Sequence, residues 1–197
     1  MKTFFIADTH FGHKKALTSS EHYSERPFRS VDEMDKVMIN RWNSVVSKRD
    51  TVFHLGDFSF CNFDKTQEIY QKLNGIIHII MGNHCRDRSI NWFRNIGFYQ
   101  VYRYPICFNN SFWLSHEPME LDNESSYINI HGHIHSRGRM KQFEHIISAT
   151  HHICVCTENI DYTPILLEDL IKYAPHNHKI KEVDISSFKE KKEKRYE

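Results

Sequence analysis

Short apolar runs alternate with amphipathic stretches through the first half of this chain. The runs are rich in β-branched and aromatic residues, which favour strands. They are Lys2–Ala7, Thr51–Leu55 and Ile76–Met81. Between them, Ser30–Lys48 places apolar residues at helical spacing after a capping box of the form S-x-x-E. Asp64–Leu73 predicts a second helix, ended by Asn74-Gly75. This order predicts an α/β layered protein whose first strands are parallel and buried.

The second half of the chain is mostly strand in its pattern. We expect a helix at Asp87–Ile96 and a final helix at Leu166–Ala174, while 146–156 has a mixed pattern. The predicted strands are Gln100–Phe108, Ser111–Ser115 and Tyr127–His131. The stretch Lys181–Glu197 carries six basic and five acidic residues. We therefore expect one domain over residues 1–180, followed by a charged tail over 181–197.

Composition narrows the classes of protein further. The chain has 197 residues, of which 40% are hydrophobic and 26% charged, an ordinary balance for one globular domain. The net charge of +1 indicates no strongly charged partner by itself. No apolar run approaches the ~18–20 residues of a membrane span, and the N-terminus lacks the pattern of a signal peptide. Five scattered cysteines argue against a disulfide framework. We expect a cytoplasmic protein with no membrane partner.

Polar side chains follow five of the apolar segments at the point where each strand ends. In a shared sheet these ends meet at one edge, where α/β proteins bind ligands. The side chains are Asp8, His10, Asp57, Asn83, His116, His133 and His135. The chain has 15 histidines in all, and histidine is the commonest metal ligand. Seven nitrogen and oxygen donors are too many for one tetrahedral zinc. They suit two divalent ions about 3.5–4 Å apart, with Mn, Fe, Zn or Ni as candidates.

The spacing of these residues resembles that of the calcineurin-like metallophosphoesterase superfamily. The motifs of that superfamily are D-x-H, G-D, G-N-H, a lone H and G-H-x-H. In the same order this chain has Asp8-Thr9-His10, Gly56-Asp57, Gly82-Asn83-His84, His116 and Gly132-His133-Ile134-His135. The opening Asp8–His13 (D-T-H-F-G-H), with Arg26-Pro27-Phe28 and Asp161–Ile165, resembles a subgroup of small bacterial and phage phosphoesterases. The resemblance implies a two-sheet β-sandwich flanked by helices.

The resemblance also implies a role for each motif residue. Asp57 would bridge two metal ions, and His84 would donate a proton to the leaving oxygen or steady the transferring phosphoryl group. One ion would be held by Asp8, His10 and His135, and the other by Asn83, His116 and His133. The cofactors would be two divalent ions, Mn²⁺ first and Fe, Ni or Zn otherwise.

Two positions depart from the family pattern. Cys85 stands where the family often has an acid that orients the motif histidine, and Phe60 stands at an expected polar position after Gly56-Asp57. For contacts with substrate we predict His13, Arg86 and Arg137, which lie close to the motifs in sequence. Arginine is well suited to bind phosphate.

The implied activity is hydrolysis of a phosphoester by attack of a metal-bridging hydroxide, with no phosphoenzyme intermediate. A small domain with no obvious cap leaves the site open, which favours a phosphodiesterase that acts on nucleotides or nucleic-acid ends. Phosphomonoesterase activity stays open as an alternative, as does a non-catalytic metal-binding scaffold of the same fold. Amidohydrolase barrels also use paired histidines, but they need about 250 residues, so this chain is too short for that fold.

Overall fold

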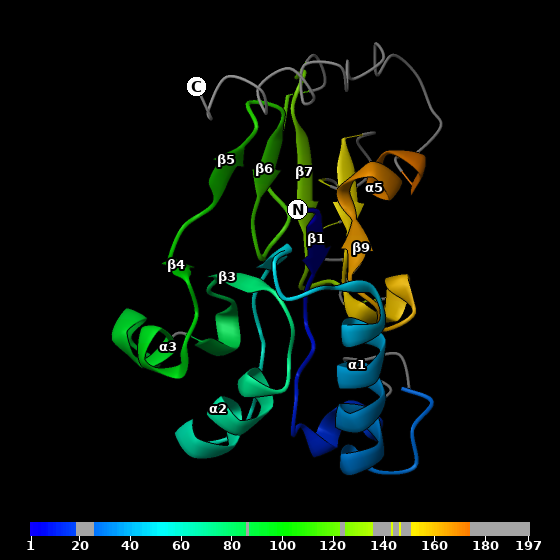
Figure 1. Cartoon of the computed structure of the whole chain (residues 1–197). Helices are drawn as coiled ribbons and strands as arrows, with labels where there is room; N and C mark the ends of the chain where they lie inside the picture. The colour runs from blue at the N-terminus through cyan, green and yellow to red at the C-terminus, as the bar shows by residue number, and fades with distance from the viewer. Residues whose placement is uncertain are drawn as a thin grey trace.

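Two β-sheets pack face to face, and helices cover the outer face of the larger sheet (Figure 1). This is the arrangement in a computed structural model, in which the structure describes residues 1–18, 26–85, 87–122, 125–135, 143, 146 and 151–173. The expected α/β sandwich flanked by helices is confirmed. The predicted tail over 181–197 lies outside the described residues.

The larger sheet is built on the strands predicted from the first half of the chain. Its order is β4-β3-β2-β1-β9, in which β1 to β4 are parallel and β9 pairs antiparallel with β1. The strands are β1 (Thr3–Ile6), β2 (Thr51–His54), β3 (Ile76–Ile80), β4 (Gln100–Tyr102) and β9 (Ile165–Leu166). Because β1, β2 and β3 are parallel, the residues that follow them emerge at one edge of the sheet.

The smaller sheet comes from the second half of the chain. Its order is β5-β6-β7-β8, in which β5 is antiparallel to β6 and the other neighbours are parallel. The strands are β5 (Ile106–Phe108), β6 (Phe112–Leu114), β7 (Ile128–His131) and β8 (His152–Cys154). The residues that follow β6 and β7 therefore also emerge together.

The first α-helix has the N-terminal cap that the sequence predicts. Ser30 Oγ accepts a hydrogen bond from the Glu33 amide at the start of the first helix, and the Glu33 carboxylate accepts one from the Arg29 amide. The first bond satisfies an amide that a helix leaves without a partner, and the second ties the residue before the cap to the first turn of the helix. The α-helices are α1 (Val31–Val45), α2 (Phe63–Gln71), α3 (Ile90–Ile96) and α5 (Leu167–Tyr173). The 3-10 turns are η1 (Lys14–Leu17), η2 (Asn83–Cys85) and η3 (Thr157–Ile160).

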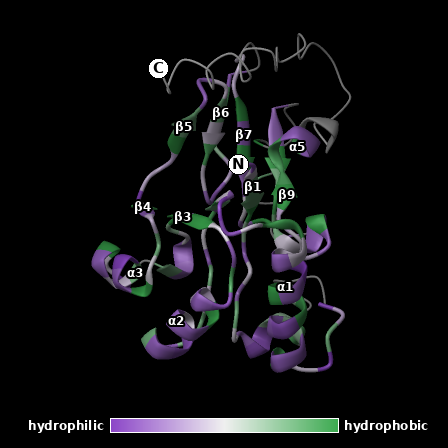
Figure 2. Ribbon diagram, in the orientation of Figure 1, coloured by the Kyte–Doolittle hydropathy of each residue, from purple (hydrophilic) through white to green (hydrophobic). Residues whose placement is uncertain are grey.

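Two apolar layers hold the sandwich together. One lies between α1, α2, α3 and the outer face of the larger sheet, with Trp42 of α1 and Phe93 of α3 fully buried in it. The other lies between the sheets, where Phe5 of β1 meets Leu114 and Ile130 of the smaller sheet. Alternate residues of β1 thus face opposite layers, as the two-residue period of a strand requires. Figure 2 shows β3, β5 and β9 as mostly apolar and α2 as mostly polar.

The sequence prediction was wrong about the stretch Gln100–Phe108. It is two strands, not one, because the chain turns at 103–105 and passes from the larger sheet to the smaller. Pro105 lies in that turn, and a proline cannot donate a ladder hydrogen bond. The short strand β9 was not predicted. The polar strand ends were also expected at the edge of a single sheet, whereas they come from two.

The two sheets meet where β1 ends. The Ala7 amide donates to Val155 O, and the Thr157 amide donates to Ala7 O, so the residues after β8 pair with the end of β1. The polar residues that follow β1, β2, β3, β6 and β7 gather at this junction.

Candidate metal centre

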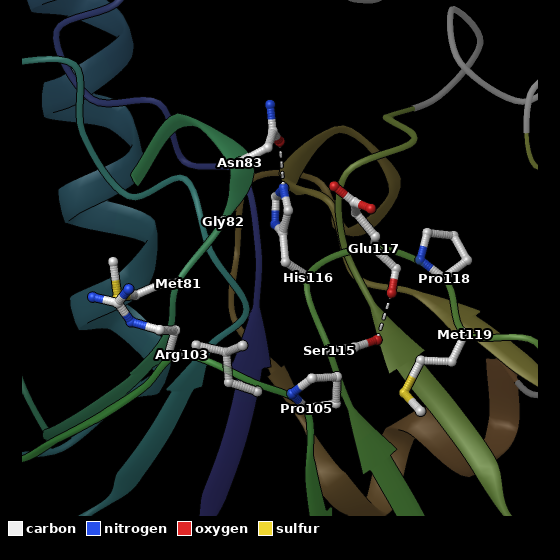
Figure 3. Close-up of a pocket in the computed structure, with 11 residues that line it drawn as sticks. Met81, Gly82, Asn83, Arg103, Pro105, Ser115, His116, Glu117, Pro118 and Met119 are labelled. Carbon is white, nitrogen blue, oxygen red and sulfur yellow. Dashed lines mark hydrogen bonds between the residues drawn. The ribbon is translucent and has the colours of Figure 1, made fainter. Parts of the chain in front are cut away.

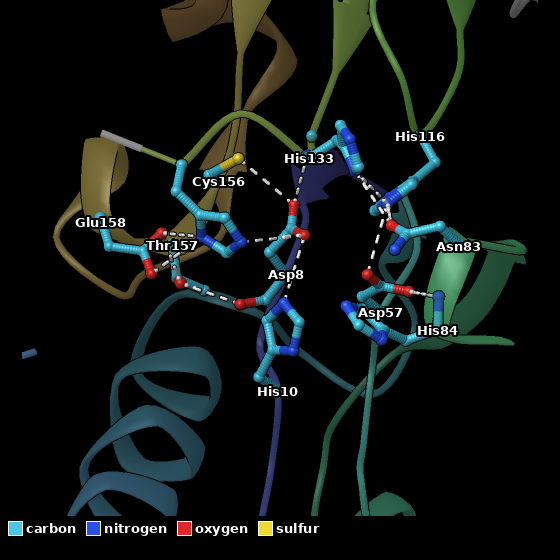
Figure 4. A network of polar contacts seen from close by, with 12 residues as sticks. Asp8, His10, Asp57, Asn83, His84, His116, His133, Cys156, Thr157 and Glu158 are labelled. Atoms are coloured by element: carbon cyan, nitrogen blue, oxygen red, sulfur yellow. Dashed lines mark hydrogen bonds and ion pairs between the residues drawn. The ribbon is translucent and has the colours of Figure 1, made fainter. Parts of the chain in front are cut away.

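The predicted ligands from the first and fifth motifs form one donor cluster at the end of β1. Asp8 Oδ1 lies 3.4 Å from His10 Nε2 and 3.7 Å from His135 Nε2. All three residues are buried. We call Asp8, His10 and His135 the first donor cluster. Figure 4 shows Asp8 at the middle of the site, between Glu158 on one side and Asp57 on the other.

A second donor cluster brings together residues that follow β3, β6 and β7. Asn83 Oδ1 is 2.8 Å from His116 Nε2 and 2.9 Å from His133 Nδ1, and the two imidazole nitrogens are 3.2 Å apart. The other nitrogen of His116 lies 2.8 Å from Leu55 O. A carbonyl can only accept, so His116 Nδ1 carries a proton and Nε2 faces its two neighbours.

Asp57 adjoins both clusters. Its Oδ2 lies 3.4 Å from His116 Nε2. Single donor atoms of Asp8, Asp57 and His116 all lie within 4.8 Å of one another, and the same holds for Asp8, His135 and Cys156. The His133 amide also donates to Asp8 Oδ2 over 2.8 Å. The structure therefore brings all seven predicted side chains into one continuous group, in which six are buried and Asn83 is half-buried.

The backbone of the site is held in a conformation that most residues avoid. Asp8, His10, Asp57, His133 and His135 all have positive φ, between 50° and 71°. This left-handed region costs a non-glycine residue roughly 1–2 kcal/mol, and such residues cluster at functional sites.

Two glycines leave the space that the carboxylates fill. A Cβ built on Gly82 would collide with the Asp57 carboxylate, and one built on Gly132 would collide with Asp8 Oδ2 and with the Cβ of Ala7. Any larger residue at either position would displace the acid beside it. These contacts explain the glycine in G-N-H and in G-H-x-H.

The electrostatics of the site follow from two acids that are buried among imidazoles. Burial raises the pKa of Asp8 and of Asp57, but neighbouring histidines outweigh it: the pKa of Asp57 falls to about 2, and that of Asp8 falls well below its ordinary range. Burial lowers the pKa of His10 to about 4. For His116 burial acts in the same direction, but the two acids raise the pKa to about 9. Without metal, the site thus holds ionised Asp8 and Asp57 beside a protonated His116 at neutral pH.

The donor set fits divalent metal ions. Asp8 Oδ1 is fully buried and accepts no hydrogen bond within the part of the chain that the structure describes. A buried carboxylate oxygen without a donor is costly unless a cation satisfies it. Mixed imidazole, carboxylate and amide donors suit Mn, Fe, Zn or Ni.

Aromatic rings form the rim of the site. His84 is exposed at η2, and its ring centroid lies 4.9 Å from that of Phe60 and 5.8 Å from that of His10. His13 stacks on Phe60 with centroids 3.7 Å apart, so it lies at the rim and not in either cluster. The ring of Phe60 also stacks on His10 with centroids 5.1 Å apart, so Phe60 contacts three histidines from a position where the family pattern has a polar residue. The predicted substrate contacts Arg86 and Arg137 lie outside the described residues.

Cys85 supports Asp57, although its position in the family often holds an acid that orients the motif histidine. Its buried thiol lies 3.7 Å from Asp57 Oδ1, an atom that also accepts the His84 amide over 3.0 Å. Burial raises the pKa of the Cys85 thiol to about 12, so it acts as a neutral donor at neutral pH. A reactive thiolate is excluded there.

A cavity of about 450 Å³ opens beside the second donor cluster (Figure 3). Asn83 and His116 border it on one side, and the turn between β4 and β5 borders it on the other. Met81 and Met119 give it apolar walls, and Arg103 adds a cation. The volume falls within the range of sites for small organic ligands, about 300–1,000 Å³.

Sequence reasoning did not assign a role to Glu158 or Arg26, which contact residues of the first donor cluster and its turn. Glu158 lies 3.1 Å from His135 Nδ1, and Arg26 donates to the carbonyl oxygens of Asp8 and Thr9. Arg26 could have been found from the sequence, because it belongs to the Arg26-Pro27-Phe28 stretch that resembles the phosphoesterase subgroup. Glu158 has no such signal, because only the fold brings it to His135.

The fold and this cluster of donor side chains are typical of metal-dependent hydrolases. The chain belongs to the calcineurin-like phosphoesterase family, whose sequence model matches residues 1–187. It is therefore a metal-dependent phosphoesterase. Among the described residues, no helix combines the length and the apolarity needed to cross a bilayer.

Three known proteins are similar to this chain, and one of them has a solved structure. The uncharacterised protein MJ1445 of Methanocaldococcus jannaschii is 35% identical over 175 residues, which cover 87% of this chain and 90% of that protein. The Gene 66 protein of Mycobacterium phage L5 is 39% identical over 57 residues, or 29% of this chain and 25% of that protein. The crystal structure of AQ665, a protein of unknown function from Aquifex aeolicus, is similar to this chain with a TM-score of 0.64 at 24% identity. That match covers 87% of this chain and 98% of that one.

Proposed function

We propose that this phosphoesterase hydrolyses phosphodiesters of nucleotides or nucleic-acid ends, and that it uses two divalent metal ions, Mn²⁺ before Fe, Ni or Zn. The observation that carries the proposal is the pair of adjoining donor clusters with Asp57 beside both. Divalent ions bound there would acidify water and neutralise the oxygens of the phosphoryl group.

Each protein group has a defined task in this proposal. The first donor cluster holds one ion, the second holds the other, and Asp57 contacts both. His116 must lose a proton when an ion binds, because its pKa in the metal-free chain is about 9. Metal binding is therefore expected to weaken as the pH falls.

His84 is the proposed proton donor to the leaving oxygen. It is exposed at the rim, so a substrate can reach it, and the hydrogen bond from its amide to Asp57 ties its position to the cluster. His13 stacks on Phe60, the ring that His84 also contacts, and is proposed as a substrate contact. General acid catalysis of this kind contributes typically ~10²–10⁴-fold.

The cavity supports a diester over a monoester. A phosphodiester carries a second organic substituent that a monoester lacks, and the cavity beside Asn83 and His116 has room for one. Its apolar walls suit the face of a base or a sugar. The Arg103 guanidinium would pair with a further phosphate of a nucleic-acid chain.

The test is a comparison of two substrates under metal control. The full chain is stripped with a chelator, restored with Mn²⁺, and assayed on a bis-aryl phosphate diester, the matching monoester and a dinucleotide. A sample carried through the same steps without chelator is the control. We expect diester and dinucleotide turnover that disappears on stripping and returns with Mn²⁺.

The other outcomes are distinct. A preference for the monoester would refute the diester assignment but keep the two-metal site. Two bound ions with no turnover of any of the three substrates would favour a non-catalytic scaffold. Turnover that survives complete stripping would refute the metal-dependent mechanism itself.

A further inference from the structure

A buried ion pair lies beside the first donor cluster and has no task in the assignments above. Arg26 Nη2 and Glu158 Oε1 are 2.8 Å apart, and the two side chains are 0% and 3% exposed. The residues are 132 positions apart in the sequence. Removing two charges from water is costly unless further hydrogen bonds offset the desolvation. The other contacts of these two side chains therefore indicate what the pair does.

The Glu158 end of the pair fixes the ring of His135. Its two carboxylate oxygens lie 3.1 Å and 3.2 Å from His135 Nδ1. An ionised carboxylate can only accept, so Nδ1 must carry the proton of the ring. His135 Nε2 is then left with its lone pair on the side of Asp8. This is the arrangement that a metal-binding histidine requires.

The Arg26 end fixes the turn that carries the other two members of the cluster. Its guanidinium donates to Asp8 O over 2.6 Å and to Thr9 O over 2.7 Å. Asp8 and His10 lie on either side of Thr9, and both have left-handed backbone. Two charge-assisted hydrogen bonds to successive carbonyls hold this turn in place.

Two further residues of η3 form hydrogen bonds with the backbone of the first donor cluster. Thr157 Oγ1 lies 3.1 Å from Asp8 O, and Asn159 donates from its side chain to His135 O over 3.3 Å. The 3-10 turn η3 therefore contacts both loops of the first donor cluster. The hydrogen bonds of Arg26 to Asp8 and Thr9, and the contact of Glu158 with His135, all lie at the first donor cluster or its turn.

We propose that Arg26 and Glu158 are a positioning pair that builds the metal site of the first donor cluster and leaves the second unaffected. Glu158 sets the tautomer and direction of His135, and Arg26 sets the turn of Asp8 and His10. The inference rests on the proposed function, because it takes these three side chains as metal ligands.

The test measures Mn²⁺ binding by the full chain in equilibrium dialysis. We compare the unaltered chain with Glu158→Gln, and Glu68→Gln serves as the matched control because its carboxylate is exposed and pairs with Lys65 and Lys72. We expect two ions for the unaltered chain and for the control. In Glu158→Gln one ion should bind with unchanged affinity and the other ~10–100-fold more weakly. Equal weakening of both ions, or none, would overturn the inference.

A second measurement needs no variant. In the metal-free full chain, nitrogen NMR of the imidazole rings should show His135 protonated at Nδ1. A ring that carries no proton at Nδ1 would overturn the inference even if Glu158→Gln does not fold. If the unaltered chain binds fewer than two Mn²⁺ ions, the proposed function fails and this inference fails with it. That outcome differs from a Glu158→Gln variant that keeps both ions.

Discussion

Replacing Glu158 with glutamine in the metal-free chain should lower the free energy of unfolding at pH 7 by about 3 kcal/mol. Burial raises the pKa of Glu158, but the charge of Arg26 and the hydrogen bond with His135 outweigh it and lower the pKa from 4.5 to about 2. Each pKa unit corresponds to about 1.4 kcal/mol. Loss of one partner of a buried ion pair costs about 3–5 kcal/mol in other proteins, which agrees with this magnitude.

The pH dependence has a definite sign. The folded pKa of Glu158 lies below the unfolded one, so its ionised form stabilises the fold above pH 4.5, and this contribution is lost as the pH falls towards about 2. Urea denaturation of chelator-treated protein, followed by circular dichroism, measures the effect at each pH. Across this range the unaltered chain should lose more stability than Glu158→Gln does.

Glu68 provides a control with the same pKa and the opposite environment. Hydrogen bonds from Lys72 and Lys65 lower its pKa to about 2 as well, but its side chain is 49% exposed. Water and salt screen an exposed pair, so Glu68→Gln should leave the unfolding free energy unchanged within error. Equal losses for the two variants, or a loss below about 1 kcal/mol for Glu158→Gln, would refute the argument from burial.

Three further substitutions test the site itself. His84→Ala should keep both Mn²⁺ ions and lower kcat by ~10²–10⁴-fold, most for alkyl leaving groups; unchanged turnover of alkyl esters in steady-state assays would exclude His84 as the proton donor. Asp57→Asn should weaken both ions in equilibrium dialysis because it removes the shared carboxylate; two ions at unchanged affinity would rule out a bridge. Gly132→Ala should lower both the urea midpoint and the affinity for one ion, since the new methyl group would collide with the carboxylate of Asp8. If neither quantity changed, the loop would have room that the structure does not show.

Much of the fold was predictable because its signals are local. The capping box at Ser30 and the helical spacing after it give α1, and the apolar runs give β1, β2 and β3 with their boundaries nearly correct. The polar residues at the strand ends were also visible, since each directly follows its strand. Their clustering in the structure agrees with the sequence pattern, while their roles as metal ligands stay predictions.

Other features depended on contacts between distant segments. Pro105 is a local signal for a break within Gln100–Phe108, but each half has a strand pattern and only the packing of the sheets assigns β4 to one sheet and β5 to the other. Cys85 and Phe60 looked like losses from the family pattern. The structure gives both residues contacts within the site: Cys85 lies against Asp57, and Phe60 stacks with His13.

The sequence by itself determined which side chains lie at the ends of the strands, because hydrophobic period and chain direction are properties of short segments. Only the tertiary structure decided how those ends meet. The contact of Glu158 with Arg26 and His135 depends on η3 lying against the turn after β1. Burial there removes the solvent that would screen the two charges, and it turns a pair distant in sequence into a strong interaction.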